Sequence, residues 1–227
     1  EVGTRTAAGR PAHMAHHGRV GRPSVSPGNR KMPVPRCAQN TVARDSFGLA
    51  SDFLPRHKHG EAMSAAPNQP LLEVLLDSWD RNNAILVNLL QLIPRGGLEA
   101  RAMEGSPTVA QMLTHIHFVR LAFVSEDAPE FARALPECEW RAEPDPSRIA
   151  QMLNESAKTV RDAVKGRLET GRAMKQHFDH PILFIQHMIW HEGYHHGQIK
   201  LALKLAGRPI ADTDAGPGTW RIWMNKK

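Results

Sequence analysis

Residues 187–200 read HMIWHEGYHHGQIK and hold four of the eight histidines that follow residue 62. His191 and His195 are four residues apart, so on a helix their rings project from one face, one turn apart. Phe184, Met188 and Ile199 share that face, which predicts that it lies partly in the core. Because buried polar groups need partners, this pair of imidazoles is suited to share one metal ion.

Apolar residues at helical spacing extend this segment and predict three further long helices. The four expected helices cover about residues 69–93, 106–126, 145–170 and 180–207, with Ser106 as N-cap of the second helix and Asp179 or His180 as cap of the fourth. No strand pattern is present. The connection of residues 127–144 is long enough to return along the bundle. We therefore expect an all-α, four-helix bundle of up-down-down-up order.

The second expected helix offers a third metal ligand in the run LTHIHFV. On the helical wheel, His115 lies at the edge of the apolar stripe, whereas His117 projects away from it and is expected to face solvent or a loop. Three neutral imidazoles would leave a coordination position open for water or substrate, as catalytic sites do. The competing interpretation is a bundle with buried histidines and no metal, since one H-x-x-x-H pair is weak evidence.

Glu192 makes the sequence HEGYH formally match the H-E-x-x-H motif of zinc proteases. Those enzymes place the motif beside a sheet, and this chain predicts none, so we expect Glu192 to form an ion pair or a hydrogen bond to a metal ligand instead. Gln198, three residues after His195, is expected to hydrogen-bond a ligand. His187 is expected only near the site, and the sole tyrosine, Tyr194, to pack half-buried or to donate a proton.

Residues 1–62 carry all of the net charge of +6, because they hold 10 Lys and Arg against 4 Asp and Glu, whereas residues 63–227 hold 19 of each. The segment up to Ala66 lacks periodicity and is rich in Gly and Pro, which predicts a disordered basic extension, and Met63 is the expected true start. Residues 67–227 form the predicted bundle. Nucleic-acid binding is expected only through the basic segment.

No apolar run could span a membrane and no secretory signal is evident, which predicts a cytoplasmic protein. The two cysteines, Cys37 and Cys138, match no metal or redox spacing, and a disulfide between them is not expected.

Two segments, SPTVAQMLTHIHFVRLAFV and HMIWHEGYHHGQIKLALKLAGRP, resemble the DinB/YfiT-like family of metal-dependent enzymes. In that family one histidine comes from the second helix and an H-x-x-x-H pair from the last, positions that match His115, His191 and His195. The resemblance covers about residues 68–225. His196 stands where arginine is common in the family, which affects the charge of the pocket and not the ligands.

The resemblance implies an up-down-down-up bundle, a homodimer and one divalent ion, for which nickel, zinc, iron and manganese are the candidates. The family includes thiol-dependent S-transferases and a mycothiol-dependent isomerase. Because a metal ion can activate a bound thiol or water, we expect a small-molecule substrate and either thiol S-transfer or hydrolysis as the activity. A metal-binding stress or interaction protein without catalysis is the alternative from another functional class.

Overall fold

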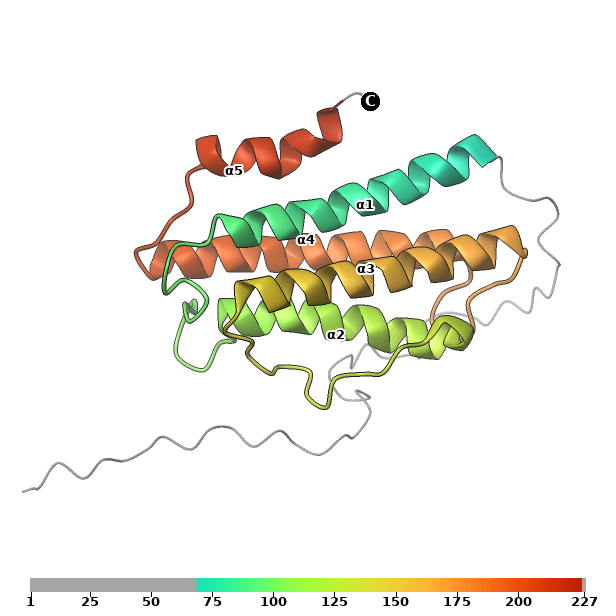
Figure 1. The fold of residues 1–227 in the computed structure, drawn as a ribbon, viewed down its shortest axis with the longest axis horizontal. Helices are drawn as coiled ribbons and strands as arrows, with labels where there is room; N and C mark the ends of the chain where they lie inside the picture. The colour runs from blue at the N-terminus through green and yellow to red at the C-terminus, as the bar shows by residue number, and fades with distance from the viewer. Residues whose placement is uncertain (1–68, 226–227) are drawn as a thin grey trace, which may run out of the picture. The chain divides into compact units, whose positions relative to one another are not determined.

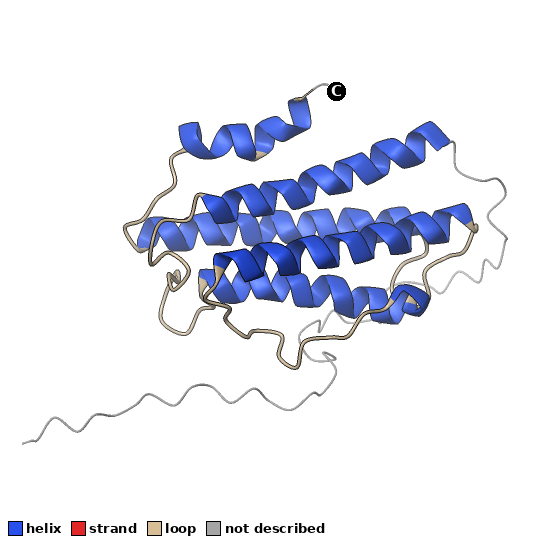
Figure 2. Cartoon of the chain, in the orientation of Figure 1, coloured by secondary structure: helices blue, strands red, loops and turns tan. Residues whose placement is uncertain are grey.

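The computed structural model of the chain describes residues 69–225, and these residues are helical, with no strand among them (Figures 1 and 2). The predictions for the N-terminal extension and for Met63 and Cys37 lie outside the described residues. The helices are α1 (Gln69–Gln91), α2 (Val109–Asp127), η1 (Pro129–Phe131), α3 (Pro146–Glu169), α4 (Pro181–Leu205), α5 (Asp212–Gly218) and η2 (Trp220–Met224). The four long helices lie alongside one another (Figure 1).

Helix caps confirm the predicted starts of α3 and α4 and correct that of α2. Asp145 caps α3 by accepting a hydrogen bond from the backbone N–H of Ser147, and His180 caps α4 through Nδ1. The N-cap of α2 is Thr108 and not Ser106. Thr108 and Gln111 bond each other's backbone N–H groups in a capping box, which satisfies two donors that Ser106 could not reach.

Two buried apolar clusters define the directions of the helices. One joins the first half of α1 and of α4 to the second half of α2 and of α3, through residues such as Trp79, Phe184, Val124 and Val164. The other joins the opposite halves, through residues such as Leu89, Leu203, Leu113 and Ile149. Helices α1 and α4 therefore run in one direction, and α2 and α3 run in the other, with residues 128–145 returning along the bundle (Figure 1).

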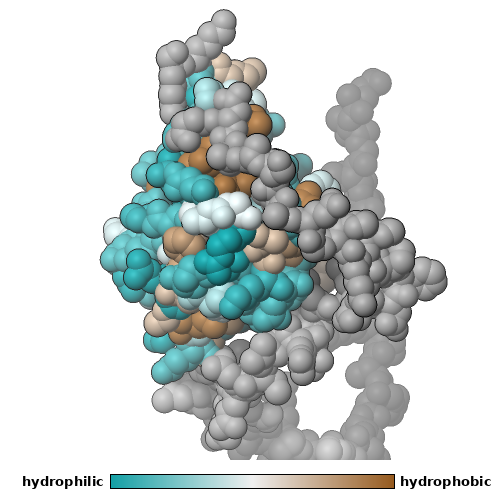
Figure 3. Space-filling view, turned by 90° about the vertical axis from the view of Figure 1, so that its right-hand side faces the viewer, coloured by the Kyte–Doolittle hydropathy of each residue, from teal (hydrophilic) through white to brown (hydrophobic). Residues whose placement is uncertain are grey.

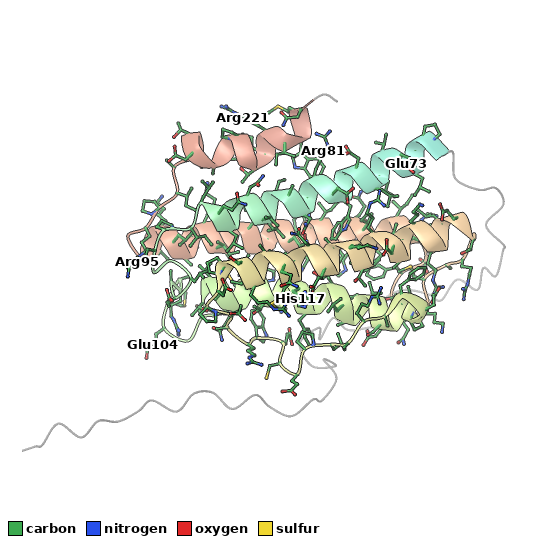
Figure 4. The ribbon with its side chains drawn as sticks, viewed as in Figure 1. Glu73, Arg81, Arg95, Glu104, His117 and Arg221 are labelled. Atoms are coloured by element: carbon green, nitrogen blue, oxygen red, sulfur yellow. The ribbon has the colours of Figure 1, made fainter. Side chains whose placement is uncertain are left out.

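The C-terminal helices pack against α1. Asn88 donates a hydrogen bond to the carbonyl of Gly218 at 2.9 Å, and Arg81 donates to the carbonyl oxygens of Ile222 and Asn225. Figure 4 shows Arg81 between α1 and this segment. These contacts hold the segment on the side of the bundle away from α2.

Two further observations bear on the sequence predictions. No helix among the described residues is long and apolar enough to cross a membrane, and polar side chains cover much of the face in Figure 3. The expectation that Cys37 and Cys138 form no disulfide depends on Cys37, which lies outside the described residues.

Candidate metal centre

His115 of α2 and the pair His191 and His195 of α4 converge between the two helices. Nε2 of His191 lies 3.3 Å from Nε2 of His115 and 3.1 Å from Nε2 of His195. Tetrahedral coordination with metal–nitrogen bonds of 2.0–2.1 Å separates ligand nitrogens by about 3.4 Å. The three histidines are thus positioned so that they could bind one metal ion.

The hydrogen bond at Nδ1 of His195 decides which nitrogen of that ring carries the proton. Nδ1 of His195 lies 2.8 Å from Oε1 of Gln198, an oxygen that can only accept, so Nδ1 carries the proton and Nε2 keeps a lone pair. His191 faces this lone pair with its own Nε2, while its buried Nδ1 has no hydrogen-bond partner among the described residues. Gln198 therefore holds His195 in the tautomer that a metal ligand needs.

Glu139 and Trp140, in the connection between η1 and α3, complete the surroundings of His115. Oε1 of Glu139 lies 2.9 Å from Nδ1 of His115, within ion-pair distance, although the N–H direction does not make an aligned hydrogen bond. The Trp140 ring stacks on the imidazole, with centroids 3.9 Å apart and planes inclined by 5°. A carboxylate beside Nδ1 favours the proton on that atom, so the Nε2 lone pair of His115 also points toward His191.

The three nitrogens cannot satisfy one another by hydrogen bonds alone. Two of them, on His115 and His195, present lone pairs, and Nε2 of His191 can donate at most one proton to one of them. At least one of these lone pairs then has no donor within the cluster. A cation between the three nitrogens would accept every lone pair, so the donor set fits a divalent metal ion.

Burial keeps the pair on α4 neutral. Desolvation, followed by the neighbouring His195, lowers the pKa of His191 to about 3, and desolvation followed by His115 lowers the pKa of His195 to about 4. At pH 7 both imidazoles therefore present lone pairs, and a metal ion would not have to compete with protons for these two ligands.

Glu192 is fully buried and belongs to a separate ion pair. Its oxygens accept hydrogen bonds from Nε and Nη2 of Arg120 at 2.6 and 2.7 Å, and Nδ2 of Asn82 donates to Oε2 at 2.5 Å. Arg120 also donates to the carbonyl of Leu153 at 2.7 Å and lies over the Trp79 ring. The ion pair expected for Glu192 is present, and a carboxylate held in this way is not available as the base of a zinc protease.

Three further histidines were expected near the site or outside it. His187 packs beside Phe123 and Phe178 and also stands edge-on to His191, with ring centroids 6.5 Å apart, so it lies near the site as expected. His117 is buried (Figure 4), with Nδ1 2.7 Å from the carbonyl of Met152, so the expectation that it faces solvent is wrong. Helix α2 is buried on nearly all sides, and α3 covers the face that the apolar stripe left open. His196 is half-buried, and desolvation lowers its pKa.

Tyr194 is 59% exposed, and its ring stands edge-on to the His195 ring with centroids 5.3 Å apart. Its phenol oxygen also accepts a hydrogen bond from Nε2 of Gln198 at 2.8 Å. The expectation that Tyr194 packs half-buried is therefore wrong, because the face of α4 that carries it has no neighbouring helix among the described residues.

Sequence reasoning missed Glu139, Trp140 and Arg120. An acidic residue next to tryptophan in a long connection gives no periodic signal that would reveal its contact.

A cavity of about 740 Å³ lies between α2, α3 and residues 133–143. His117 and Arg141 line it, and the three converging histidines do not. Two contacts hold residues 133–143 between the cavity and the histidines. Trp140 stacks on His115, and the hydroxyl of Thr114 donates a hydrogen bond to the carbonyl of Arg141 at 2.7 Å.

A sequence profile of the DinB family matches residues 63–223. No curated protein and no solved structure was found to match the chain.

Proposed function

The chain belongs to the DinB family, and from this premise we propose that it is a metalloenzyme that holds one divalent ion through His115, His191 and His195. The observation that carries the proposal is the convergence of three imidazole nitrogens that cannot satisfy one another. The directions of the four long helices support the further proposal of an up-down-down-up bundle of the DinB type.

Thiol transfer or hydrolysis is the reaction class that this site suits. Three histidine ligands leave a position for a water molecule or a substrate thiol, whose pKa a divalent ion would lower. Nickel, zinc, iron and manganese all accept imidazole, so the donor set alone does not select among them. The described residues near the site include no separate nucleophile, which favours an activated water or thiol in that role.

The neighbours of the ligands have separate tasks in this proposal. Gln198 orients His195 by accepting a hydrogen bond from its Nδ1, and Glu139 lies within ion-pair distance of Nδ1 on His115, which directs Nε2 of that ring toward the site. Trp140 fixes the plane of the His115 ring by stacking on it and shields it from water. Together they keep the ligands in place before a metal arrives, which lowers the cost of ordering them.

Elemental analysis of the full chain, purified without an affinity tag, tests metal binding. We expect about one equivalent of metal per chain in the wild type and a loss of it in both His115→Ala and His195→Ala. His117→Ala is the matched control, because its ring also lies on α2 and is also buried, but it bonds α3. No metal after reconstitution, or equal loss in the control, would overturn the ligand assignment.

A metal-binding protein without catalysis is the second candidate, and the stacking of Trp140 on His115 favours it by covering one side of the site. Cobalt-substituted protein distinguishes the two, since its visible absorption reports on ligands. If the spectrum changes when a small thiol is added, or changes with pH near neutrality, the ion has an open coordination position and the enzyme is supported. A spectrum insensitive to both supports the second candidate.

A further inference from the structure

The cavity between α2, α3 and residues 133–143 lies on a different side of α2 from the candidate metal centre (Figure 1). His115 meets the histidines of α4, whereas His117, about 200° further round the helix, bonds α3 and lines the cavity. The cavity volume of about 740 Å³ is typical of pockets that hold a small molecule. It therefore offers a second place for a ligand, separate from the three histidines.

Three arginines of the cavity wall have no task in the fold. Arg133 and Arg141 come from the connection between η1 and α3, Arg148 comes from the first turn of α3, and all three are exposed. Their guanidinium groups form no ion pair and no hydrogen bond among the described residues. Because a guanidinium presents a planar fork of N–H donors that matches the two oxygens of a carboxylate, these side chains are suited to bind an anion.

The charge of the cavity wall matches a ligand with one negative charge. Four cationic side chains stand against three acidic ones, a net charge of +1: Arg133, Arg141, Arg148 and Lys158 against Glu143, Glu155 and Asp162. His117 adds no charge at pH 7, because desolvation lowers its pKa. A phosphate monoester carries nearly two negative charges at this pH, and the acidic side chains would oppose the second. The charge balance therefore favours a carboxylate.

The inner part of the cavity supplies an apolar wall and one hydrogen-bond acceptor. Leu121 is buried and Met152 half-buried, and both line the cavity. The ring of His117 is buried and donates from Nδ1 to the carbonyl of Met152 at 2.7 Å, so the neutral imidazole keeps a lone pair on Nε2. This atom has no hydrogen-bond partner in the part of the chain that the structure describes. A hydroxyl or N–H group of a ligand would give it one.

We propose that this cavity binds a small organic carboxylate. The three arginines surround the carboxylate at the exposed side, the apolar body of the ligand packs against Leu121 and Met152, and a hydroxyl or N–H group donates to Nε2 of His117. The site goes beyond the proposed metalloenzyme and does not rest on it, because none of the three converging histidines lines the cavity.

Ligand-observed NMR titration of the full chain with 4-hydroxyphenylacetate tests the site, with a chelator present so that no metal ion can bind the carboxylate. We expect saturable binding that is about 5- to 10-fold weaker in Arg148→Met, because one guanidinium is lost. Arg161→Met is the matched control, since Arg161 also lies on α3 but pairs with Asp80 and does not line the cavity. No binding of the probe up to about 10 mM, or equal weakening in the two variants, would overturn the proposal.

Related compounds test the charge of the ligand. We expect 4-hydroxyphenylethanol, which has no carboxylate, to bind at least about 10-fold more weakly than 4-hydroxyphenylacetate. Phenyl phosphate should bind no more tightly than phenylacetate, because the acidic side chains oppose its second charge. Tighter binding of the phosphate would contradict the assignment to a carboxylate.

The hydroxyl of the probe tests the contact with His117. Phenylacetate lacks this donor and should bind the wild type about 5-fold more weakly than 4-hydroxyphenylacetate, whereas the two should bind His117→Ala equally. Comparing two ligands on one variant removes any effect of the substitution on folding. An unchanged difference in His117→Ala would show that Nε2 is not the acceptor.

His191→Ala separates this proposal from that of the metal centre. We expect the variant to bind 4-hydroxyphenylacetate as the wild type does, whether or not the wild type binds metal, because His191 does not line the cavity. Loss of probe binding in His191→Ala would place the carboxylate at the three histidines and overturn the second site.

Discussion

Two polar clusters lie side by side between α2 and α4, and they differ in whether they are complete. His191 belongs to the cluster of three histidines, and its neighbour Glu192 belongs to the cluster with Arg120 and Asn82. Every oxygen of Glu192 has a donor, and Arg120 is surrounded by acceptors. In the histidine cluster, three nitrogens of the same kind face one another, and Nδ1 of His191 lacks a partner among the described residues.

This difference separates a structural cluster from a candidate binding site. Buried polar groups that satisfy one another hold helices together and leave nothing for a ligand to gain. Buried polar groups that lack partners lower the stability of the ligand-free protein. A ligand of the right charge restores that stability when it binds. The ion pair should therefore respond to mutation through stability, and the histidines through metal binding.

The largest effect is expected from Arg120→Met. It leaves the Glu192 carboxylate buried without its cation, which should lower the free energy of unfolding by about 3–5 kcal/mol. Urea unfolding measures it. The matched control is Arg161→Met, which breaks an exposed ion pair to Asp80 at 3.2 Å and should cost less than about 1 kcal/mol. Equal losses in the two variants would mean that the buried pair is not the structural element we describe.

His191→Ala should remove the stabilisation by metal and leave the metal-free protein as stable as the wild type. At a free metal concentration 100 times the dissociation constant, we expect about 2.7 kcal/mol of stabilisation in the wild type. The measurement is thermal unfolding with a chelator and with added nickel or zinc. A variant that still gains stability from metal, or that is unstable with chelator present, would remove the distinction between the clusters.

Glu139→Gln should weaken metal binding by about 10- to 100-fold, because the neutral amide no longer places a negative charge beside Nδ1 of His115 to orient the ring. Competition against a chromophoric chelator measures the dissociation constant. Glu104→Gln, an exposed residue at the end of the bundle (Figure 4), is the control and should have no effect. Unchanged affinity in Glu139→Gln would show that the carboxylate contact does not act on the ligand.

The smallest effect is expected from His117→Ala. It leaves the carbonyl of Met152 without its side-chain donor and should cost about 1–2 kcal/mol in stability, with metal content unchanged. Unfolding and elemental analysis on one preparation give both numbers. A loss of metal here would place His117 in the site after all.

Several features of the fold and site were predictable from the sequence for local reasons. The period of 3.6 residues predicted the four long helices, and the spacing of His191 and His195 placed their rings on one face whatever packs against it. His115 followed because it lies beside the apolar stripe of α2. Gln198 followed because residues three apart on a helix touch.

Other features depended on the tertiary structure. His117 and Arg120 are buried because α3 and α4 pack against α2, and no property of α2 alone predicts which neighbours it has. Glu139 and Trp140 reach His115 because their connection returns along the bundle, and an aperiodic segment carries no signal of its path. The sequence by itself determined the helices and the histidine pair on one face of α4, whereas tertiary packing decided which polar groups have hydrogen-bond partners, because those partners are distant in the chain.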